Sequence, residues 1–295
     1  MRQVANTAVV VFQALRVYQW TKNLLVFAAL IFARQVLEPA QFLKSLEAFA
    51  AFCMAASATY LFNDFLDIEK DRTHPKKRNR PLASGTLSLP AAWVMIVVLF
   101  SASVALAWTI RLPFLLAVLF YILLTLTYSL FLKNWVLIDV MAVALGFVTR
   151  AMAGALAINE PFSNWLVVCT LFLALFLGLS KRRSEITLME KGAHTHRRVL
   201  FHYTVHYLDQ LIIIVASGAL ITYTIYTCSP EVVARLGTDK LYLTLPFVVY
   251  GLFRYLFLVH QRTGGGDPSG TLLQDWPLGL TVVLWGIACM AIIYI

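Results

Sequence analysis

An acidic cluster stands where a long apolar segment gives way to a basic one. Residues 63–71 read Asn-Asp-Phe-Leu-Asp-Ile-Glu-Lys-Asp, so Asp64, Asp67 and Asp71 are spaced by three and four and share one face of a helix. Ionised carboxylates are costly at membrane depth, and a row of them there indicates an ion or substrate site. Together with the amide of Asn63 they form an oxygen-rich set of the kind that binds Mg²⁺ and phosphate groups. We therefore predict that all four residues bind magnesium and that the three aspartates are catalytic.

The segment that follows Asp71 is strongly basic. It contains Arg72, Arg78 and Arg80 within a few residues of the carboxylates. Cations beside a metal site can bind the phosphate oxygens that the metal leaves free. A positively charged loop is also common in membrane proteins without such a role. Because the carboxylates directly precede this loop, we favour a site for a metal–phosphate complex, with these three arginines as candidate substrate-binding residues.

A second charged cluster ends a later apolar segment. Residues 181–185 read Lys-Arg-Arg-Ser-Glu, which is basic where the first cluster is acidic. Cations at a helix C-terminus are also favoured by the helix dipole and by an anionic leaflet. The presence of the acidic cluster favours the alternative, in which Lys181 and Arg182 bind substrate phosphate.

Five further polar residues stand in segments that are otherwise apolar: Lys22, Tyr128, Lys133, Asp139 and Arg150. We include them as candidate substrate-binding residues. Asp139 and Arg150 are three helical turns apart, so they share a face but are too distant to pair with each other. Each needs a partner on another helix or on a ligand. Polar pairing that only fixes helix packing remains open.

Composition identifies an integral membrane protein. The chain has 295 residues, of which 60% are hydrophobic and 13% are charged, and its mean hydropathy is +0.76. We expect no cleavable signal peptide, because the first apolar segment is interrupted by polar residues and lacks a small-residue cleavage site. Nine spans are long enough to cross ~30 Å of hydrocarbon as helices. They run over about 13–33, 45–63, 88–108, 113–132, 136–157, 162–180, 204–228, 240–260 and 275–295.

The distribution of Lys and Arg predicts the orientation. With the N-terminus inside, the inner segments hold 18 of these residues and the outer loops hold 5, while Arg150 lies within a span. This asymmetry indicates a cytoplasmic N-terminus and an odd number of helices. We expect a single domain over residues 1–295, with catalytic loops at about 64–87 and 181–203 facing the cytoplasm.

The first motif resembles a signature of a known family. Asn63-Asp64-x-x-Asp67-x-x-x-Asp71, followed by Arg72 and Arg80-Pro81-Leu82, is similar to the first motif of the UbiA superfamily of intramembrane prenyltransferases. The resemblance implies a bundle of nine membrane helices around a central cavity. It also implies a magnesium-dependent diphosphate site and a lateral opening for a polyprenyl chain. Tyr128 and Lys133 match the Tyr…Lys element of that family, in which the lysine contacts the diphosphate.

The second motif departs from most of that family. Members that prenylate aromatic rings carry a second aspartate-rich motif where this chain has residues 181–185. The chain resembles instead the branch that transfers phosphoribosyl from phosphoribosyl diphosphate to decaprenyl phosphate, giving decaprenylphosphoryl-5-phosphoribose. Residues 18–23, 146–154 and 264–268 also resemble that branch.

That resemblance implies the ligands and the location of the protein. Lys22, Lys181 and Arg182 would bind the ribose 5-phosphate or the acceptor phosphate, and Lys133 and the arginines of the first loop would bind the diphosphate. The protein would lie in a bacterial inner membrane and use Mg²⁺ to make a precursor of a cell-wall arabinan. We expect no nucleic-acid partner, and the sequence leaves a homo-oligomer open.

Two other functions fit parts of the sequence. An aromatic prenyltransferase of quinone or haem biosynthesis fits the first motif but would lack the second. A transporter with intramembrane carboxylates accounts for Asp64 and Arg150 but not for the contiguous string from Asn63 to Leu82.

Overall fold

The computed structural model describes residues 7–74, 77–161, 163–190, 198–261 and 268–295, and all secondary structure within them is helical. Eight helical segments in this part of the chain are long and apolar enough to cross a membrane. They are α3 (Pro39–Leu66), α5 (Leu89–Ile110), α6 (Leu112–Leu130), α7 (Ile138–Ile158), α8 (Asn164–Glu190), α9 (Val205–Cys228), η5 with α11 (Lys240–Thr244 and Leu245–Gln261) and α13 (Trp276–Tyr294). The protein is therefore a multi-pass membrane protein, and the last eight predicted spans are confirmed.

The first predicted span is not one continuous helix. It is divided into α1 (Thr7–Leu15), the 3₁₀ helix η1 (Val17–Phe27) and α2 (Ala28–Phe32). Arg16 interrupts the helix between α1 and η1, because its backbone adopts the left-handed conformation with φ 51° and ψ 48°. A 3₁₀ helix repeats every three residues, so Arg16, Gln19 and Lys22 lie along one edge. This edge supplies polar groups to the bundle. Where the first of the nine spans was expected, the described chain has a shorter apolar segment, Val17–Phe32.

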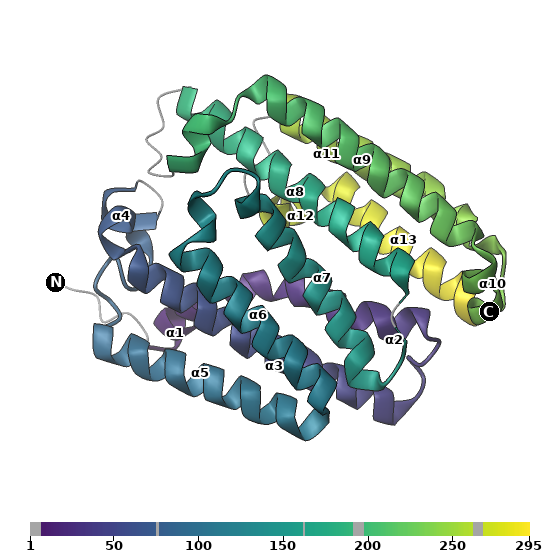
Figure 1. Ribbon diagram of the computed structural model, residues 1–295, viewed down its shortest axis with the longest axis horizontal. Coiled ribbons are helices and arrows are strands. Elements are labelled where there is room, and N and C mark those ends of the chain that lie inside the picture. The colour runs from purple at the N-terminus through teal and green to yellow at the C-terminus, as the bar shows by residue number, and fades with distance from the viewer. Residues whose placement is uncertain (1–6, 75–76, 162, 191–197, 262–267) are drawn as a thin grey trace.

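Helices α3 and α7 form the centre of the bundle. The apolar windows of both are 61% buried, whereas those of α5 and α13 are 17% buried. Both helices are rich in alanine at buried positions, and small residues allow helices to approach closely in a membrane. Helix α5 packs beside α3, while α9 packs against α8 and α11 on the other side (Figure 1).

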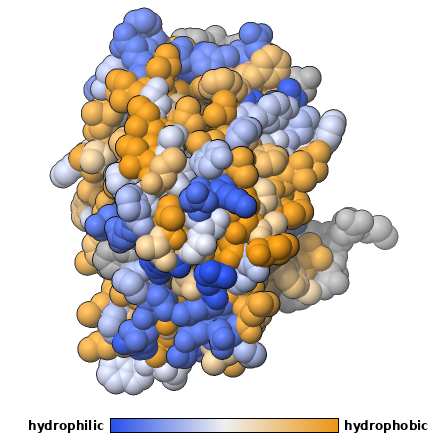
Figure 2. All heavy atoms as spheres, turned by 90° about the vertical axis from the view of Figure 1, so that its right-hand side faces the viewer, coloured by the Kyte–Doolittle hydropathy of each residue, from blue (hydrophilic) through white to orange (hydrophobic). Residues whose placement is uncertain are grey.

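The two ends of the bundle carry different short elements. Helix α4 (Ile68–Thr73) lies at one end, and α10 (Pro230–Leu236) lies with the C-terminus at the other (Figure 1). At the α10 end, hydrophilic residues lie in the middle and at the lower edge of the face, with hydrophobic residues on its flanks (Figure 2). The remaining short elements are η2 (Lys77–Asn79), η3 (Leu132–Asn134), η4 (Arg198–His202) and α12 (Pro268–Gln274).

The structure corrects one predicted loop. Helix α8 continues to Glu190, so Lys181 and Arg182 lie within the last turns of a helix and not in a loop that begins at 181. Residues 191–197 of that predicted loop and residues 264–267 of the glycine-rich segment lie outside the described residues.

A glycine brings η1 against α7. A Cβ atom at Gly154 would lie 2.0 Å from the carbonyl oxygen of Val26, which no side chain could tolerate. Gly154 therefore allows the backbone of η1 to lie directly on α7. The same contact sets how deeply the polar edge of η1 enters the bundle.

Gly154→Ala is expected to lower the free energy of unfolding by about 1–3 kcal/mol, because either helix must move to remove the clash. Gly286→Ala is the matched control, since a Cβ atom at Gly286 in α13 meets nothing within 4 Å. Thermal unfolding of both purified variants in detergent measures the difference. Equal melting temperatures for the two variants would contradict this account of η1 packing.

Candidate functional site

The end of α3 carries the acidic cluster across a break in the helix. Asp67 lies between α3 and α4 with φ −104° and ψ 13°. Backbone hydrogen bonds continue through the break, from the N–H of Asp67 to the oxygen of Asn63 (3.1 Å) and from the N–H of Asp71 to the oxygen of Asp67 (2.8 Å). The spacing by three and four therefore still brings Asp64 and Asp71 to the same side.

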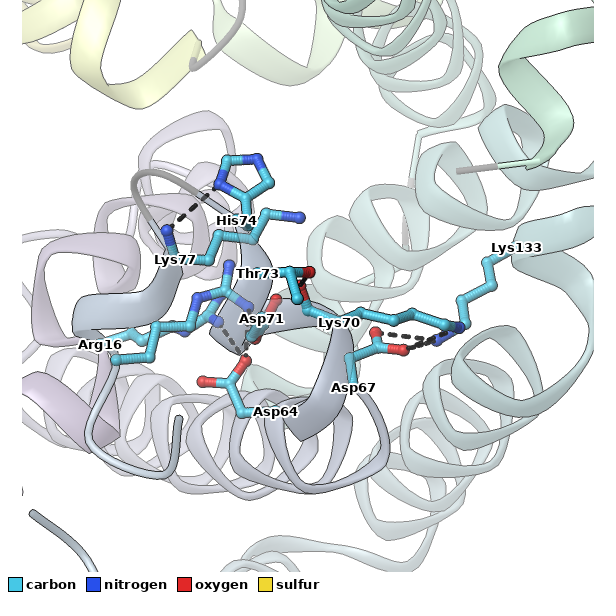
Figure 3. A network of polar contacts seen from close by, with 10 residues as sticks. Arg16, Asp64, Asp67, Lys70, Asp71, Thr73, His74, Lys77 and Lys133 are labelled. Atoms are coloured by element: carbon cyan, nitrogen blue, oxygen red, sulfur yellow. Dashed lines mark hydrogen bonds and ion pairs between the residues drawn. The ribbon is translucent and has the colours of Figure 1, made fainter. Parts of the chain in front are cut away.

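Asp64 and Asp71 converge on one arginine. Nη1 of Arg80 lies 2.9 Å from Oδ1 of Asp64 and 2.6 Å from Oδ2 of Asp71. Arg16 donates a further hydrogen bond to Asp64 (Figure 3). Both carboxylates are buried, with side chains only 5% and 4% exposed. Burial raises the pKa of Asp71 above its usual value even though Arg80 acts to lower it.

This arrangement fits a divalent cation. The guanidinium nitrogen of Arg80 stands between two carboxylate oxygens, where it takes the place that a metal ion takes between oxygen ligands. Asn63 precedes Asp64 directly and is half-buried. Carboxylate and amide oxygens are the ligands that Mg²⁺ prefers.

A hydrogen-bonded turn positions Arg80 at the carboxylates. The carbonyl oxygen of Pro81 accepts hydrogen bonds from the N–H of Leu87 (3.0 Å) and from the hydroxyl of Thr86 (3.3 Å). Gly85 has φ 76°, a conformation that favours glycine. Leu82 and Leu87 are buried in an apolar cluster with Leu61 of α3. The Arg-Pro-Leu sequence thus anchors a loop whose first residue points into the acidic cluster.

Asp67 turns the other way. Its two carboxylate oxygens lie 3.1 and 3.0 Å from Nζ of Lys133 in η3, and Lys70 lies 3.5 Å away (Figure 3). In the part of the chain that the structure describes, no three carboxylate, histidine or cysteine side chains gather as one metal-binding group. The three carboxylates are therefore divided in this arrangement: two converge on Arg80, and the third pairs with Lys133. Binding of Mg²⁺ by all three stays a prediction.

A second layer of polar side chains lies one helical turn deeper. Tyr60 of α3 stacks under Arg16, whose guanidinium carbon is 5.2 Å from the ring centroid, and Nζ of Lys22 is 6.0 Å from the same ring. Lys181 of α8 lies within electrostatic range of Lys22, Tyr128 and Glu185. Elements far apart in the sequence therefore bring predicted phosphate-binding residues together.

Arg182 is held by carboxylates. Its Nε donates to Oδ2 of Asp139 (2.7 Å), and its Nη1 donates to Oε2 of Glu185 (2.7 Å). Asp139 is fully buried behind it and accepts a second hydrogen bond from the hydroxyl of Tyr203 (2.9 Å). The expected partner of Asp139 on another helix is confirmed. Direct binding of substrate by Asp139 or Arg182 stays a prediction.

Arg150 is the deepest charged residue on α7. Its guanidinium donates to Asn23 (2.7 Å), to the hydroxyl of Tyr121 (2.7 Å) and to the carbonyl of Gly146 (2.9 Å). It lies eleven residues beyond Asp139, about 16 Å along the helix axis. These contacts join η1, α6 and α7, which favours a packing role; its predicted binding of substrate is untested.

Two predicted arginines lie at the surface. Arg72 pairs with the exposed Glu69 (2.8 Å) and donates to the carbonyl of Ala83 (3.4 Å), and Arg78 is exposed in η2. Neither is paired with Asp64, Asp67 or Asp71 in this arrangement.

Sequence reasoning assigned no site role to three residues that the structure brings to the site: Arg16, Tyr60 and Tyr203. Arg16 could have been found as a charge inside the first apolar segment. The tyrosines have no such signal, because tyrosine is common at the ends of membrane spans.

Asp64→Asn is expected to lower the free energy of unfolding by about 2 kcal/mol or more, since it leaves Arg16 and Arg80 without their shared carboxylate. The double variant Asp64→Asn/Arg16→Gln removes one of the two positive charges that Asp64→Asn leaves without a carboxylate partner. It should recover part of the lost free energy of unfolding. Thermal unfolding in detergent gives both values.

The matched control is Glu69→Gln, whose carboxylate is 84% exposed and pairs with the exposed Arg72. It should stay within about 0.5 kcal/mol of wild type. A double variant that is less stable than Asp64→Asn alone would contradict the pairing described for Arg16.

Comparison with known proteins places these features in a family. A model of the UbiA prenyltransferase family matches residues 23–274. A decaprenyl-phosphate phosphoribosyltransferase of Mycobacterium tuberculosis (strain CDC 1551 / Oshkosh) is 32% identical over 95% of this chain and 93% of its own length. A protein of the same name from Corynebacterium glutamicum is 33% identical over 98% of this chain and 88% of its own.

Solved structures share the fold. A UbiA homolog from Archaeoglobus fulgidus, solved bound to GPP and Mg²⁺, superposes with a TM-score of 0.72 and 20% sequence identity. The superposition covers 96% of this chain and 99% of that one.

Proposed function

The chain belongs to the UbiA prenyltransferase family, and from this membership we propose that it transfers a 5-phosphoribosyl group from phosphoribosyl diphosphate to a polyprenyl phosphate. The observation that carries the proposal is a pair of cations from distant elements. Lys22, beside the ring of Tyr60 one helical turn before Asp64, lies within electrostatic range of Lys181. A prenyl donor brings a single diphosphate. This reaction must hold a diphosphate, a ribose 5-phosphate and a lipid phosphate together, which requires additional cations. The relatives are named for transfer of a phosphoribosyl group to decaprenyl phosphate, which agrees with the proposed acceptor and transferred group.

The donor diphosphate would bind at the acidic cluster. Asp64 and Asp71, with Asn63 beside them, would hold Mg²⁺, and Asp67 would complete the set after leaving Lys133. When bound there, Mg²⁺ supplies Lewis-acid stabilisation to the departing diphosphate. Arg80 and Lys133, released from the carboxylates, would then bind diphosphate oxygens.

The other two phosphates would bind at the second layer. Lys22 comes from η1 and Lys181 from α8, and both Lys22 and Tyr128 lie within electrostatic range of Lys181. We assign these lysines to the ribose 5-phosphate or the acceptor phosphate. Asp139 and Glu185 would hold Arg182 beside them as a fixed positive charge.

The reaction needs positioning and charge more than proton transfer. The bond between the anomeric carbon and the diphosphate oxygen breaks, and its electron pair leaves with the diphosphate. An oxygen of the polyprenyl phosphate forms the new bond to the same carbon from the opposite face. Positive charge develops on the sugar, as in other glycosyl transfers. The phosphate nucleophile is already ionised near neutral pH, so the residues act by orienting the reactants and stabilising charge.

We also place the α4 end of the bundle at the cytoplasm of a bacterial inner membrane. The excess of Lys and Arg in segments predicted to be inside supports this orientation. Phosphoribosyl diphosphate and magnesium are both available on that side.

A transfer assay tests the proposed function. Radiolabelled phosphoribosyl diphosphate, Mg²⁺ and polyprenyl phosphate are incubated with the purified protein, and label entering the organic phase is counted. We expect transfer by the wild type, no transfer after chelation of the metal, and a loss of about 100-fold or more in Asp64→Asn and Asp67→Asn. No transfer by the wild type, together with prenylation of an aromatic acceptor from a prenyl diphosphate, would overturn the proposal.

Lys181→Ala is expected to raise the KM for phosphoribosyl diphosphate or for polyprenyl phosphate about tenfold or more, because one charge-assisted phosphate contact is lost. Lys181→Arg keeps the charge and should retain most of the affinity. Steady-state kinetics with each substrate varied in turn shows which phosphate is affected. Unchanged KM values for both substrates would remove Lys181 from the site.

A further inference from the structure

The hydroxyl of Tyr203 makes two hydrogen bonds at the start of α7. Tyr203 lies between η4 and α9, and its side chain is buried with 4% exposed. The hydroxyl accepts a hydrogen bond from the backbone N–H of Leu137 (2.6 Å) and donates one to Oδ1 of Asp139 (2.9 Å). Burial raises the pKa of Tyr203, so the hydroxyl stays protonated and can donate. A single oxygen thus contacts both the turn before α7 and the first turn of α7.

The turn that Tyr203 contacts has an unfavourable backbone. Leu137 has φ 65° and ψ −40°, although residues with a β-carbon rarely adopt positive φ. Such conformations persist only where surrounding contacts hold them. The hydrogen bond from Leu137 to Tyr203 is one of these contacts, and hydrogen bonds from Ile138 to Val136 (2.8 Å) and from Asp139 to Trp135 (3.0 Å) are others.

The same turn carries Lys133. Lys133 lies in η3, four residues before Leu137, and its ammonium group holds both oxygens of Asp67. Elements η3 and η4 also pack against each other. A shift of the turn at Leu137 would therefore move Lys133 relative to the acidic cluster.

The same hydroxyl also orients the carboxylate of Asp139. Oδ1 of Asp139 accepts a hydrogen bond from the hydroxyl of Tyr203, and Oδ2 accepts one from Nε of Arg182. The carboxylate can turn only if both bonds adjust. Tyr203 thereby fixes the plane of the carboxylate that holds Arg182, next to Lys181.

We propose that Tyr203 is a positioning residue that holds Lys133, on the diphosphate side, and Arg182, on the side of the other phosphates, in one fixed relative arrangement. The role in phosphate binding rests on the proposed function. The hydrogen bonds that define the arrangement do not.

Tyr203→Phe keeps the ring and removes only the hydroxyl. Its matched control is Tyr207→Phe, because Tyr207 stacks on Tyr203 with ring centroids 6.5 Å apart and is 38% exposed. Binding of inorganic diphosphate with Mg²⁺ to the full-length protein, measured by calorimetry, is the primary readout. We expect about tenfold weaker binding in Tyr203→Phe, from the loss of contacts made by a displaced Lys133, and no change in Tyr207→Phe.

A double-mutant cycle separates positioning from general destabilisation. If Tyr203 acts through Lys133, Tyr203→Phe/Lys133→Ala should bind diphosphate no more weakly than Lys133→Ala alone. If the loss of affinity in the double variant equals the product of the losses in the two single variants, the proposal is overturned. A Tyr203→Phe protein that binds within twofold of wild type, or a Lys133→Ala protein that binds like wild type, would also overturn it.

Glycine at position 137 provides a second variant, because glycine adopts positive φ without strain. The affinity of Tyr203→Phe/Leu137→Gly for diphosphate should be closer to that of the wild type than to that of Lys133→Ala. This holds also if Tyr203→Phe alone does not fold. Binding equal to or weaker than that of Lys133→Ala would overturn the proposal. Because diphosphate binding is measured without the transfer reaction, absence of phosphoribosyl transfer in the wild type would count against the proposed function only.

Discussion

Charge neutralisation in a medium of low dielectric constant governs this site. Asp64 and Asp71 share Arg80, Asp67 holds Lys133, and Asp139 holds Arg182. An uncompensated charge would be costly at this depth. A charged ligand therefore has to exchange partners with the protein. In the proposed reaction the carboxylates would hold Mg²⁺, and Arg80 and Lys133 would bind phosphate oxygens instead of the carboxylates. Such an exchange favours binding of metal and diphosphate together over either one alone.

The helices make this pairing possible by approaching closely. Alanines on α3 and α7, and Gly154 against the carbonyl of Val26, let the narrow 3₁₀ helix η1 lie against both. Its three-residue repeat then directs Arg16 toward Asp64 and Lys22 toward Tyr60. Packing of small residues thus sets the position of charges that lie many residues away in the sequence.

Much of the fold could be predicted from the sequence, because long apolar runs report directly on membrane spans. The local spacing of Asp64 and Asp71 likewise predicted that they lie together. The division of the first span at Arg16 could not be predicted, because the left-handed backbone of that residue has no signal in the sequence. The pairing of Asp67 could not be predicted either, because Lys133 is distant in sequence. Tyr203 was not found for a similar reason: its role depends on contacts with Leu137 and Asp139, which no local pattern encodes.

The polar side chains of the interior form a column that begins at the α4 end and reaches Arg150. Beyond Arg150, α2 and α7 close the interior with an apolar cluster of Ala29, Leu30, Ala155 and Ile158. Carrying one elementary charge across a membrane potential takes about 2.3 kcal/mol per 100 mV. In the proposed function, phosphorylated reactants would enter and leave at the α4 end only. No net charge would then cross the membrane during the reaction, and the membrane potential would be preserved.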